Sequence, residues 1–306
     1  MPLWIAVTCI AALFQTWRTA LQQKLRGQLS LNAAAVVRYL YGVPVGAAIL
    51  LTYWLIFGGW IGSPTLWFLL LSVGAGIGQI LGTNLLISSF GPRGFAVGTA
   101  YSKTEAVQAS IIAVILLGEM LPPLAWLGIG VSVFGVMYLS LAGRDITPRE
   151  FLAATLQPAA LRGMGAGLCF AFTAIFIRSA NTAIDGPDPI LKAMATLVIT
   201  NILQTLMQGS WLLLREPASV MAVFRSWRVS APVGALSACG STGWFVAFAL
   251  APVALVRAVG QVEILFTLLF SRFFLGERTK PRDVLGALLV VGGVVLVLIG
   301  AWHKGQ

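Results

Sequence analysis

Charged residues are scarce in this sequence, and histidine and clustered cysteine are nearly missing. Only 10% of the 306 residues are charged, whereas a soluble domain carries about 25%. So few charges cannot cover a water-facing surface, which favours a polytopic membrane protein. The 58% hydrophobic content and the mean hydropathy of +0.90 agree with that class. The one histidine, His303, and three scattered cysteines, Cys9, Cys169 and Cys239, predict neither a disulfide framework nor a protein-bound metal.

The sequence also lacks the motifs of common catalytic sites. It contains no phosphate-binding P-loop, no Ser-His-Asp constellation and no paired catalytic carboxylates with a metal. The glycines of VGAGIGQILGTN follow no strand, and Gly74, Gly78 and Gly82 are spaced four apart, as in closely packed membrane helices. We therefore expect no enzyme activity and no cofactor. Without a nucleotide-binding domain, any uphill transport would draw on an ion or exchange gradient.

Apolar segments long enough to cross a bilayer recur ten times. A spanning helix takes about 20 mostly apolar residues. The predicted spans are 3–22, 32–56, 64–88, 94–118, 122–141, 160–180, 189–214, 230–250, 253–275 and 281–302. The longer connections 142–159 and 215–229 are predicted to form short interfacial helices, because each has an apolar edge. We expect no cleaved signal sequence, since no basic region precedes the first span.

Basic residues gather in the loops that would share one side of the membrane. If the loops are numbered in chain order by the spans that they join, the odd-numbered loops share one side of the membrane. These loops and the adjoining span ends hold twelve basic residues: Lys24, Arg26, Arg93, Arg144, Arg149, Arg162, Arg215, Arg225, Arg228, Arg278, Lys280 and Arg282. The other side has about three. The positive-inside rule then places the odd loops in the cytoplasm and both termini outside. We expect the location to be the inner membrane of a bacterium. The net charge of +10 reflects this orientation and contact with anionic lipid, so we expect no nucleic-acid partner.

The two halves of the sequence repeat each other. At an offset of 158 residues, Glu105 matches Glu263 and Gly118-Glu119 matches Gly276-Glu277. The further matches at this offset are Gly128 with Gly286 and Gly135 with Gly293. One repeat has five spans, and because five is odd the copies insert with opposite polarity. The prediction is an all-α integral membrane protein of ten transmembrane helices, built as two inverted five-helix repeats around a central cavity. Residues 1–142 form the first repeat, 143–159 the connection and 160–306 the second.

The ends of the fourth and ninth spans carry a family resemblance. They read LLGE at 116–119 and FLGE at 274–277, each followed by a short turn and a glycine-rich last span. With the ten spans and the repeat, the chain resembles the drug/metabolite transporter superfamily, and is most similar to its EamA-type branch, over nearly its whole length. The resemblance implies a basket of ten helices that moves small organic solutes by alternating access. It further implies a cavity lined mainly by the first, third and fourth spans of each half. It does not supply the substrate, which varies widely in such proteins.

Glu105 and Glu263 are the first candidates for a site. A charge at the bilayer centre costs roughly 2.5–3.5 kcal/mol on insertion scales, so neither carboxylate should face lipid. Each either contacts substrate or carries a proton, or else bonds neighbouring helices and fixes the bundle. Both interpretations stay open here.

The cations beside these carboxylates are the second candidates. On a regular helix Lys103 lies about 200° from Glu105, so the two cannot reach one ligand unless the helix unwinds there. Tyr101, Glu105 and Gln108 share a face, as do Arg257 and Gln261 in the second copy. Lys103 and Arg257 either contact substrate or pair with Glu105 and Glu263 across helices.

Other polar residues in the spans have two interpretations each. Asn84 matches Trp244 at an offset of 160, and both could line the cavity or pack in the core.

Glu119 and Glu277 are predicted to be structural caps, because each precedes a new helix whose first N–H groups are free.

Three arginines near span ends remain. Arg38 is either a snorkelling side chain, which we favour, or a substrate contact. Arg18 and Arg178 are predicted to be anchors, since a cation near a helix C-terminus is favoured by the helix dipole and can reach the headgroups.

The leading hypothesis is a secondary transporter, and we favour an exporter, of a small polar metabolite. Basic residues in or near the spans outnumber the central carboxylates, which favours a zwitterionic or anionic solute such as an amino acid. The central carboxylates suggest proton coupling, with exchange against a counter-substrate as the alternative. The other expected partners are membrane lipids, and the protein would act as a monomer or homodimer. The alternative class is an integral-membrane enzyme or lipid-handling protein, which would usually need an interfacial cluster of His, Asp or Ser.

Overall fold

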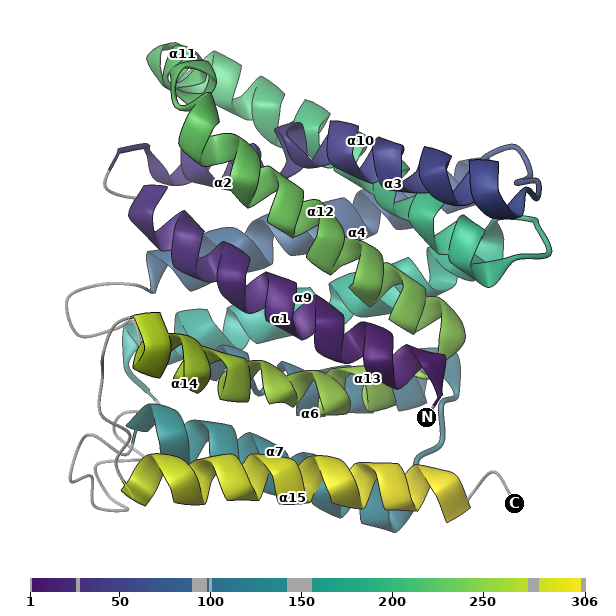
Figure 1. Ribbon diagram of the computed structural model, residues 1–306, viewed down its shortest axis with the longest axis vertical. Coiled ribbons are helices and arrows are strands. Elements are labelled where there is room, and N and C mark those ends of the chain that lie inside the picture. The colour runs from purple at the N-terminus through teal and green to yellow at the C-terminus, as the bar shows by residue number, and fades with distance from the viewer. Residues whose placement is uncertain are drawn as a thin grey trace. The chain divides into compact units, whose positions relative to one another are not determined.

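The computed structural model describes residues 2–25, 28–89, 98, 101–141, 156–274 and 281–303. All regular structure in these residues is helical, as Figure 1 shows. The helices of the first half are α1 (Leu3–Leu25), α2 (Leu31–Leu40), α3 (Gly42–Phe57), α4 (Leu66–Ser88), α6 (Glu105–Leu117) and α7 (Pro123–Leu141). Those of the second half are α9 (Pro158–Ala183), α10 (Pro189–Arg215), α11 (Pro217–Arg225), α12 (Trp227–Leu250), α13 (Val253–Val259), the 3₁₀ turn η1 (Gly260–Val262), α14 (Glu263–Phe274) and α15 (Pro281–His303).

Seven helical segments within the described residues are long and apolar enough to cross a membrane. They are Leu31–Phe57, Leu66–Ser88, Pro158–Ala183, Pro189–Arg215, Trp227–Leu250, Val253–Phe270 and Asp283–Trp302. Each coincides with a predicted span. The other three predicted spans coincide with α1 and with the shorter apolar helices α6 and α7. The predicted helix in 215–229 is α11, whereas most of the connection 142–159 lies outside the described residues.

Packing divides the chain into two compact units. Unit 1 comprises residues 1–80 and 176–251, and unit 2 comprises 81–175 and 252–306. Each unit therefore combines segments from both halves of the sequence. The predicted division into repeats concerns sequence similarity rather than packing, and it stays a prediction.

In unit 1, α1 and α12 lie side by side (Figure 1) because small residues let their backbones approach. A methyl group at Gly243 would lie 2.8 Å from the Ala11 Cβ, and one at Gly240 would lie 3.4 Å from the Gln15 nitrogen. Gly234 of the same helix packs against Tyr41, where the chain bends between α2 and α3. These contacts hold α12 against α1, α2 and α3.

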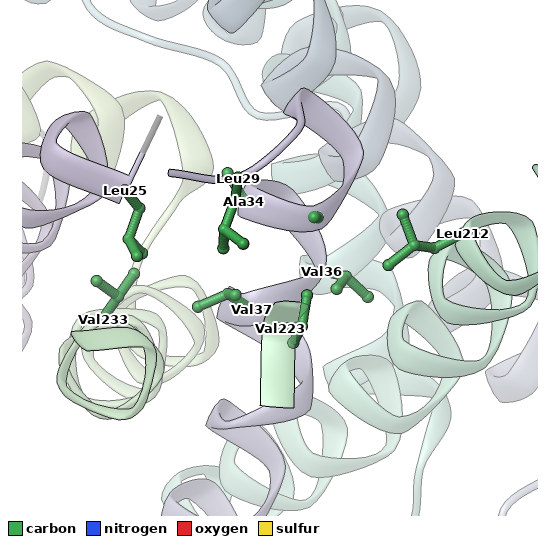
Figure 2. Packing of buried hydrophobic residues seen from close by; sticks show 9 residues of the cluster. Leu25, Leu29, Ala34, Val36, Val37, Leu212, Val223 and Val233 are labelled. Carbon is green, nitrogen blue, oxygen red and sulfur yellow. The ribbon is translucent and has the colours of Figure 1, made fainter. Parts of the chain in front are cut away.

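Apolar side chains fill the space between α2, α10, α11 and α12 in unit 1. Figure 2 shows this cluster, which the end of α1 and the turn after it complete. Its members are Leu25, Leu29, Ala33, Ala34, Val36, Val37, Leu212, Val223 and Val233.

The carboxylate of Glu216 fixes the start of α2 against the junction of α10 and α11. Ser30, the N-cap of α2, donates to Glu216 Oε2 at 2.5 Å, and Asn32 Nδ2 donates to Oε1 at 2.7 Å. Ser219 Oγ donates a weaker bond at 3.3 Å. Hydrogen bonds from Ser30 and then Asn32 lower the pKa of Glu216, because they stabilise its ionised form.

In unit 2, α7 and α15 lie side by side over most of their length (Figure 1). A methyl group at Gly128 would lie 2.5 Å from the Gly293 carbonyl oxygen, and one at Gly135 would lie 3.0 Å from the Gly286 carbonyl oxygen. The repeat pairs Gly128 with Gly286 and Gly135 with Gly293, so the contacts are crossed between the two pairs. The glycines allow close packing that any side chain would prevent.

Candidate functional site

Glu105 and Glu263 each begin a helix just after an interruption. Residues 103 and 104 form a turn, and α6 starts at Glu105. The 3₁₀ turn η1 separates α13 from α14, which starts at Glu263. The sequence predicted continuous helices over 94–118 and 253–275, so in their described parts this expectation is wrong.

Local chemistry accounts for the first interruption. The Thr104 hydroxyl donates to the Tyr101 carbonyl oxygen at 2.6 Å, and the Thr104 N–H points to the same oxygen at 3.2 Å. Threonine often offers the backbone such an alternative to helical bonding. At the second interruption the chain passes through Gly260, a residue that weakens a continuous helix.

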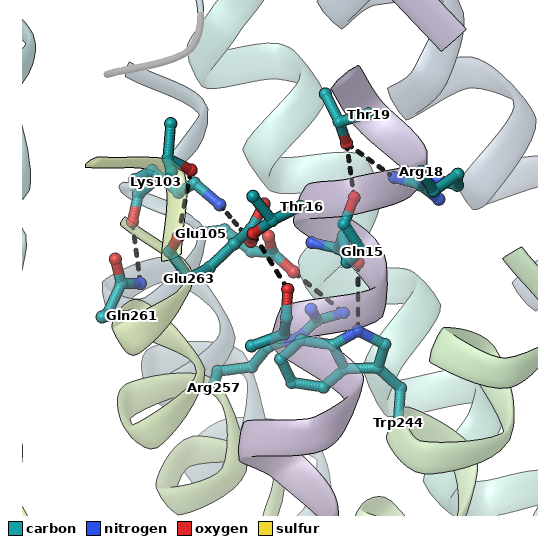
Figure 3. A network of polar contacts seen from close by, with 12 residues as sticks. Gln15, Thr16, Arg18, Thr19, Lys103, Glu105, Trp244, Arg257, Gln261 and Glu263 are labelled. Atoms are coloured by element: carbon teal, nitrogen blue, oxygen red, sulfur yellow. Dashed lines mark hydrogen bonds and ion pairs between the residues drawn. The ribbon is translucent and has the colours of Figure 1, made fainter. Parts of the chain in front are cut away.

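Two crossed ion pairs join the interruptions. Lys103 Nζ lies 2.6 Å from Glu263 Oε2, and Arg257 Nη2 lies 2.9 Å from Glu105 Oε1 (Figure 3). Each carboxylate thus pairs with a cation from the other half of the sequence. The four side chains are 13–17% exposed. Lys103, in the turn, and Glu105, at the start of α6, both reach this cluster.

Helix α9 and Gln261 support the ion pairs from within unit 2. Arg257 Nη2 donates weakly to the Phe170 carbonyl oxygen at 3.4 Å, and Gln261 Nε2 donates to the Lys103 carbonyl oxygen at 3.5 Å. Gln261 is 5% exposed, and its Oε1 has no hydrogen-bond partner among the described residues. The carboxylates lie at the N-termini of α6 and α14 and Arg257 in the last turn of α13, where helix dipoles favour those charges.

Tyr101 is buried in a small apolar cluster of unit 2. Its side chain is 2% exposed and packs against Ala160, with Met137 and Met164 beside it. Gln108 donates to the Met164 carbonyl oxygen at 3.4 Å and to Thr104 Oγ1 at 3.3 Å. Tyr101 and Gln108 therefore both lie beside Met164, whereas Glu105 pairs with Arg257.

Asn84 and Trp244, paired by the repeat, lie in different units. Trp244 Nε1 donates to Gln15 Oε1 at 3.0 Å (Figure 3), and its ring stacks 6.0 Å from Phe248. At 7% exposure, Trp244 is part of the interface between α1 and α12. Asn84 is half-buried, and its Oδ1 has no partner within the described residues.

The predicted snorkelling of Arg38 is wrong. Its side chain is 5% exposed, its Nε donates to Ser237 Oγ at 3.4 Å, and its guanidinium lies 5.5 Å from the centre of the Tyr39 ring. The residue occupies the last turn of α2 and reaches α12 instead of a headgroup. Composition could not reveal this, because it does not say which face of α2 packs.

Arg178, predicted to be a headgroup anchor, instead caps another helix. Its Nη1 donates to the carbonyl oxygens of Phe248 at 2.6 Å and Ala249 at 2.9 Å, in the last turn of α12. Carbonyl groups there have no partner within their own helix. Arg18 Nη2 donates to Thr19 Oγ1 at 3.4 Å.

Glu119 accepts a free helical N–H, but not from the helix that follows it. Gly118, with φ of 66°, ends α6, and Glu119 Oε2 accepts from the Val253 N–H at 2.9 Å. The sequence predicted that Glu119 would accept from an N–H group of α7, the next helix, so the predicted partner was wrong. Glu277, the matched residue, lies outside the described residues.

Comparison with known proteins gives a family match for the second half of the chain. No curated protein matches this sequence. The model of the EamA-like transporter family matches residues 157–299. This segment, close to half of the chain, is therefore similar to the EamA-like transporter family, part of the drug/metabolite transporter superfamily. One solved structure, described only as a crystal structure of a protein, has 16% identity and a TM-score of 0.71, and covers 96% of this chain and 98% of its own.

The family match over residues 157–299 and the apolar helices together indicate a multi-pass membrane protein. The described residues contain no group of three or more His, Cys, Asp or Glu side chains that could hold a metal. What the site of this EamA-like protein offers is paired opposite charges, two helix N-termini and a buried amide. That arrangement suits reversible binding of a small charged molecule.

Sequence reasoning about this EamA-like chain missed a polar stripe on α10. Gln204 is fully buried and its Nε2 donates to Gln79 Oε1 at 2.6 Å. Thr200 and Gln208, four residues to either side, are also buried. The signal was present in the four-residue spacing of polar side chains within an otherwise apolar span.

Proposed function

We propose that this protein is a secondary transporter that exports a small zwitterionic or anionic metabolite by alternating access. The single observation that carries the proposal is the crossed set of ion pairs, Lys103–Glu263 and Arg257–Glu105, at two helix interruptions. Interrupted helices beside charged side chains are a common construction of substrate and ion sites in transporters. The match to the EamA-like family supports transport as the class of function.

The ten-helix inverted repeat is part of this proposal. It is supported by the crossed glycine contacts between α7 and α15, in which each glycine meets the counterpart of the other. Two copies related by a two-fold axis contact each other in this reciprocal way. The basic residues of the odd loops support an orientation with both termini outside a bacterial inner membrane.

A zwitterion could exchange partners with the ion pairs. Its carboxylate would take the place of Glu263 or Glu105 beside a cation, and its ammonium group would meet the displaced Glu side chain. One ion pair of the protein is then replaced by two ion pairs with the solute, so every charge keeps a partner. This matters in a low-dielectric site, where an unpaired charge has a high free-energy cost. An anionic solute would require a proton on the displaced carboxylate, which links binding to proton movement.

Flux into proteoliposomes tests the proposal. Purified protein should accelerate exchange of a radiolabelled mixture of zwitterionic amino acids and of small organic acids. Arg257→Met should abolish the exchange. Glu119→Gln is the matched control, because it alters a carboxylate of the same unit that caps a helix instead of joining the ion pairs. A folded protein that moves none of these solutes would contradict the proposal.

Proton coupling has its own experiment. Glu105→Gln and Glu263→Gln should each abolish accumulation driven by a proton gradient while exchange without a gradient persists. If both variants still accumulate solute, the carboxylates are not the proton carriers.

A further inference from the structure

Helix α10 carries a second buried polar region, separate from the ion pairs and confined to unit 1. Thr200, Gln204 and Gln208 follow one another at intervals of four residues, so they form one stripe along the helix. Their exposed fractions are 1%, 0% and 3%. None of the three carries a charge.

Several polar atoms in this stripe have no hydrogen-bond partner among the described residues. They are Thr200 Oγ1, Gln204 Oε1, and both Nε2 and Oε1 of Gln208. Other threonines of α10 show the usual solution, since Thr196 and Thr205 donate to the carbonyl oxygens of Lys192 and Asn201 at 2.8 Å. Buried polar groups almost always have a partner, and those that do not require an explanation.

Helix α4 supplies a second polar stripe beside the first. Ser72, Gly76 and Gln79 share one of its faces, at positions i, i+4 and i+7. Gln79 accepts from Gln204, and a methyl group at Gly76 would lie 3.2 Å from Gln204 Cγ. Ser72 is 0% exposed, and its Oγ also lacks a partner within the described residues.

We propose that these two stripes form a binding site for neutral hydrogen-bonding groups, hydroxyls or amides. The stripes offer donors and acceptors, as in the Gln208 amide, but no charge to hold an ion. The ligand is either water or the uncharged polar part of the transported solute. Only the second source rests on the proposed transport function.

Single cysteines test the site in a variant that lacks Cys9, Cys169 and Cys239. Cysteine would replace Thr200, Gln204 or Gln208, with Ile202 and Leu206, 41% and 59% exposed, as matched controls on other faces of α10. The probe is a membrane-impermeant trimethylammonium methanethiosulfonate. Cysteines in the stripe should react at least about tenfold faster than the controls, because the reactive thiolate forms only where water reaches it.

The result also identifies the ligand. Protection of the stripe by a mixture of zwitterionic amino acids would assign the site to the solute. Fast reaction without protection would assign it to water, even if the protein transports nothing. Rates equal to those of the two controls would overturn the proposal.

A stability measurement covers the case in which the cysteine variants fold poorly. Gln208→Met keeps the length of the side chain and removes both amide atoms. In a dry site this change should raise Tm, because it removes an unsatisfied buried amide. In a site that binds water or solute, Tm should not rise. Gln204→Met is the control, because it also removes the hydrogen bond that Gln204 donates to Gln79, and it should lower Tm.

Discussion

The carboxylate of Glu119, at the end of α6, accepts a hydrogen bond from the backbone N–H of Val253, the first residue of α13. The bond spans 134 residues of sequence and lies at one end of the contact between α6 and α13. The other end of that contact holds the Arg257–Glu105 pair. The two helices are therefore fixed by a polar contact at each end.

Removing the cap should weaken α13 without touching the ion pairs. Glu119→Ala should lower the free energy of unfolding by about 1 kcal/mol, the usual effect of losing a side-chain cap. Glu119→Gln keeps an oxygen acceptor and should lose less. Thermal unfolding of the purified variants in detergent measures both, and equal losses for the two would contradict a capping role.

The crossed ion pairs allow structural and functional roles to be separated. Lys103→Met leaves Glu263 without this partner and should cost about 3 kcal/mol or less, since both side chains keep some exposure. The double variant Lys103→Met/Glu263→Met should recover most of that loss, because no charge is left uncompensated.

Transport by the double variant then decides between the two roles. Recovered stability with lost flux would assign the pair to substrate or proton binding. Recovery of both would make the pair a fixed brace between helices, as one interpretation of the sequence held. The corresponding single variant of Arg257 and double variant of Arg257 and Glu105 repeat the same test on the second ion pair.

Glycines of the α7–α15 contact should differ sharply from their neighbours. Gly293→Ala would place a methyl group 2.5 Å from the Ser132 nitrogen, and overpacking of this kind costs about 1–3 kcal/mol. Gly292→Ala is the matched control, with no atom within 4 Å of the added methyl group. It should be neutral or stabilise the helix by up to about 1 kcal/mol. Similar unfolding temperatures for the two variants would contradict the close packing.

The stabilising effect of Glu216 should depend on pH. Hydrogen bonds from Ser30 and Asn32 hold its pKa below the ordinary value of 4.5, so its ionised form is favoured in the folded protein. The contribution is therefore complete above the pKa of the unfolded chain, and it disappears as pH falls through the lower pKa of the folded state.

Comparison with Glu216→Gln isolates this contribution. The difference in Tm between the two proteins should be largest at neutral pH and should shrink as pH falls below 4.5. Ser219→Ala is a useful control, because Ser219 gives the carboxylate its longest bond, at 3.3 Å, and its loss should change the profile least. A Tm difference independent of pH would show that Glu216 acts without its charge.

Regular features of this protein could be predicted from the sequence. Length and apolarity located the segments that became α1 to α4, α9, α10 and α12. The repeat also matched Glu105 with Glu263, and both residues begin a helix, although the sequence predicted them within continuous spans. These predictions depend on periodicity and composition, which report burial and helix length directly.

Partners across the fold could not be predicted in the same way. The turn at 103 and 104 depends on a Thr104 hydroxyl bond that competes with the helix, and a continuous apolar pattern hides it. Arg38 and Arg178 were assigned by their distance from helix ends, but the faces of neighbouring helices decided their contacts. The pairing of Lys103 with Glu263 was one of two open interpretations, because spacing within a helix does not specify what another helix presents.

The crossed glycine contacts make the surface of α7 complementary to that of α15, the helix that the sequence repeat matches with it. Gly128 meets Gly293 and Gly135 meets Gly286, so exchanging the two helices would reproduce the same set of contacts. That is the rule of a homodimer interface, here contained in one polypeptide. Under the inverted repeat proposed above, two copies of a half-length chain inserted in opposite orientations would form this helix pair through the same contacts.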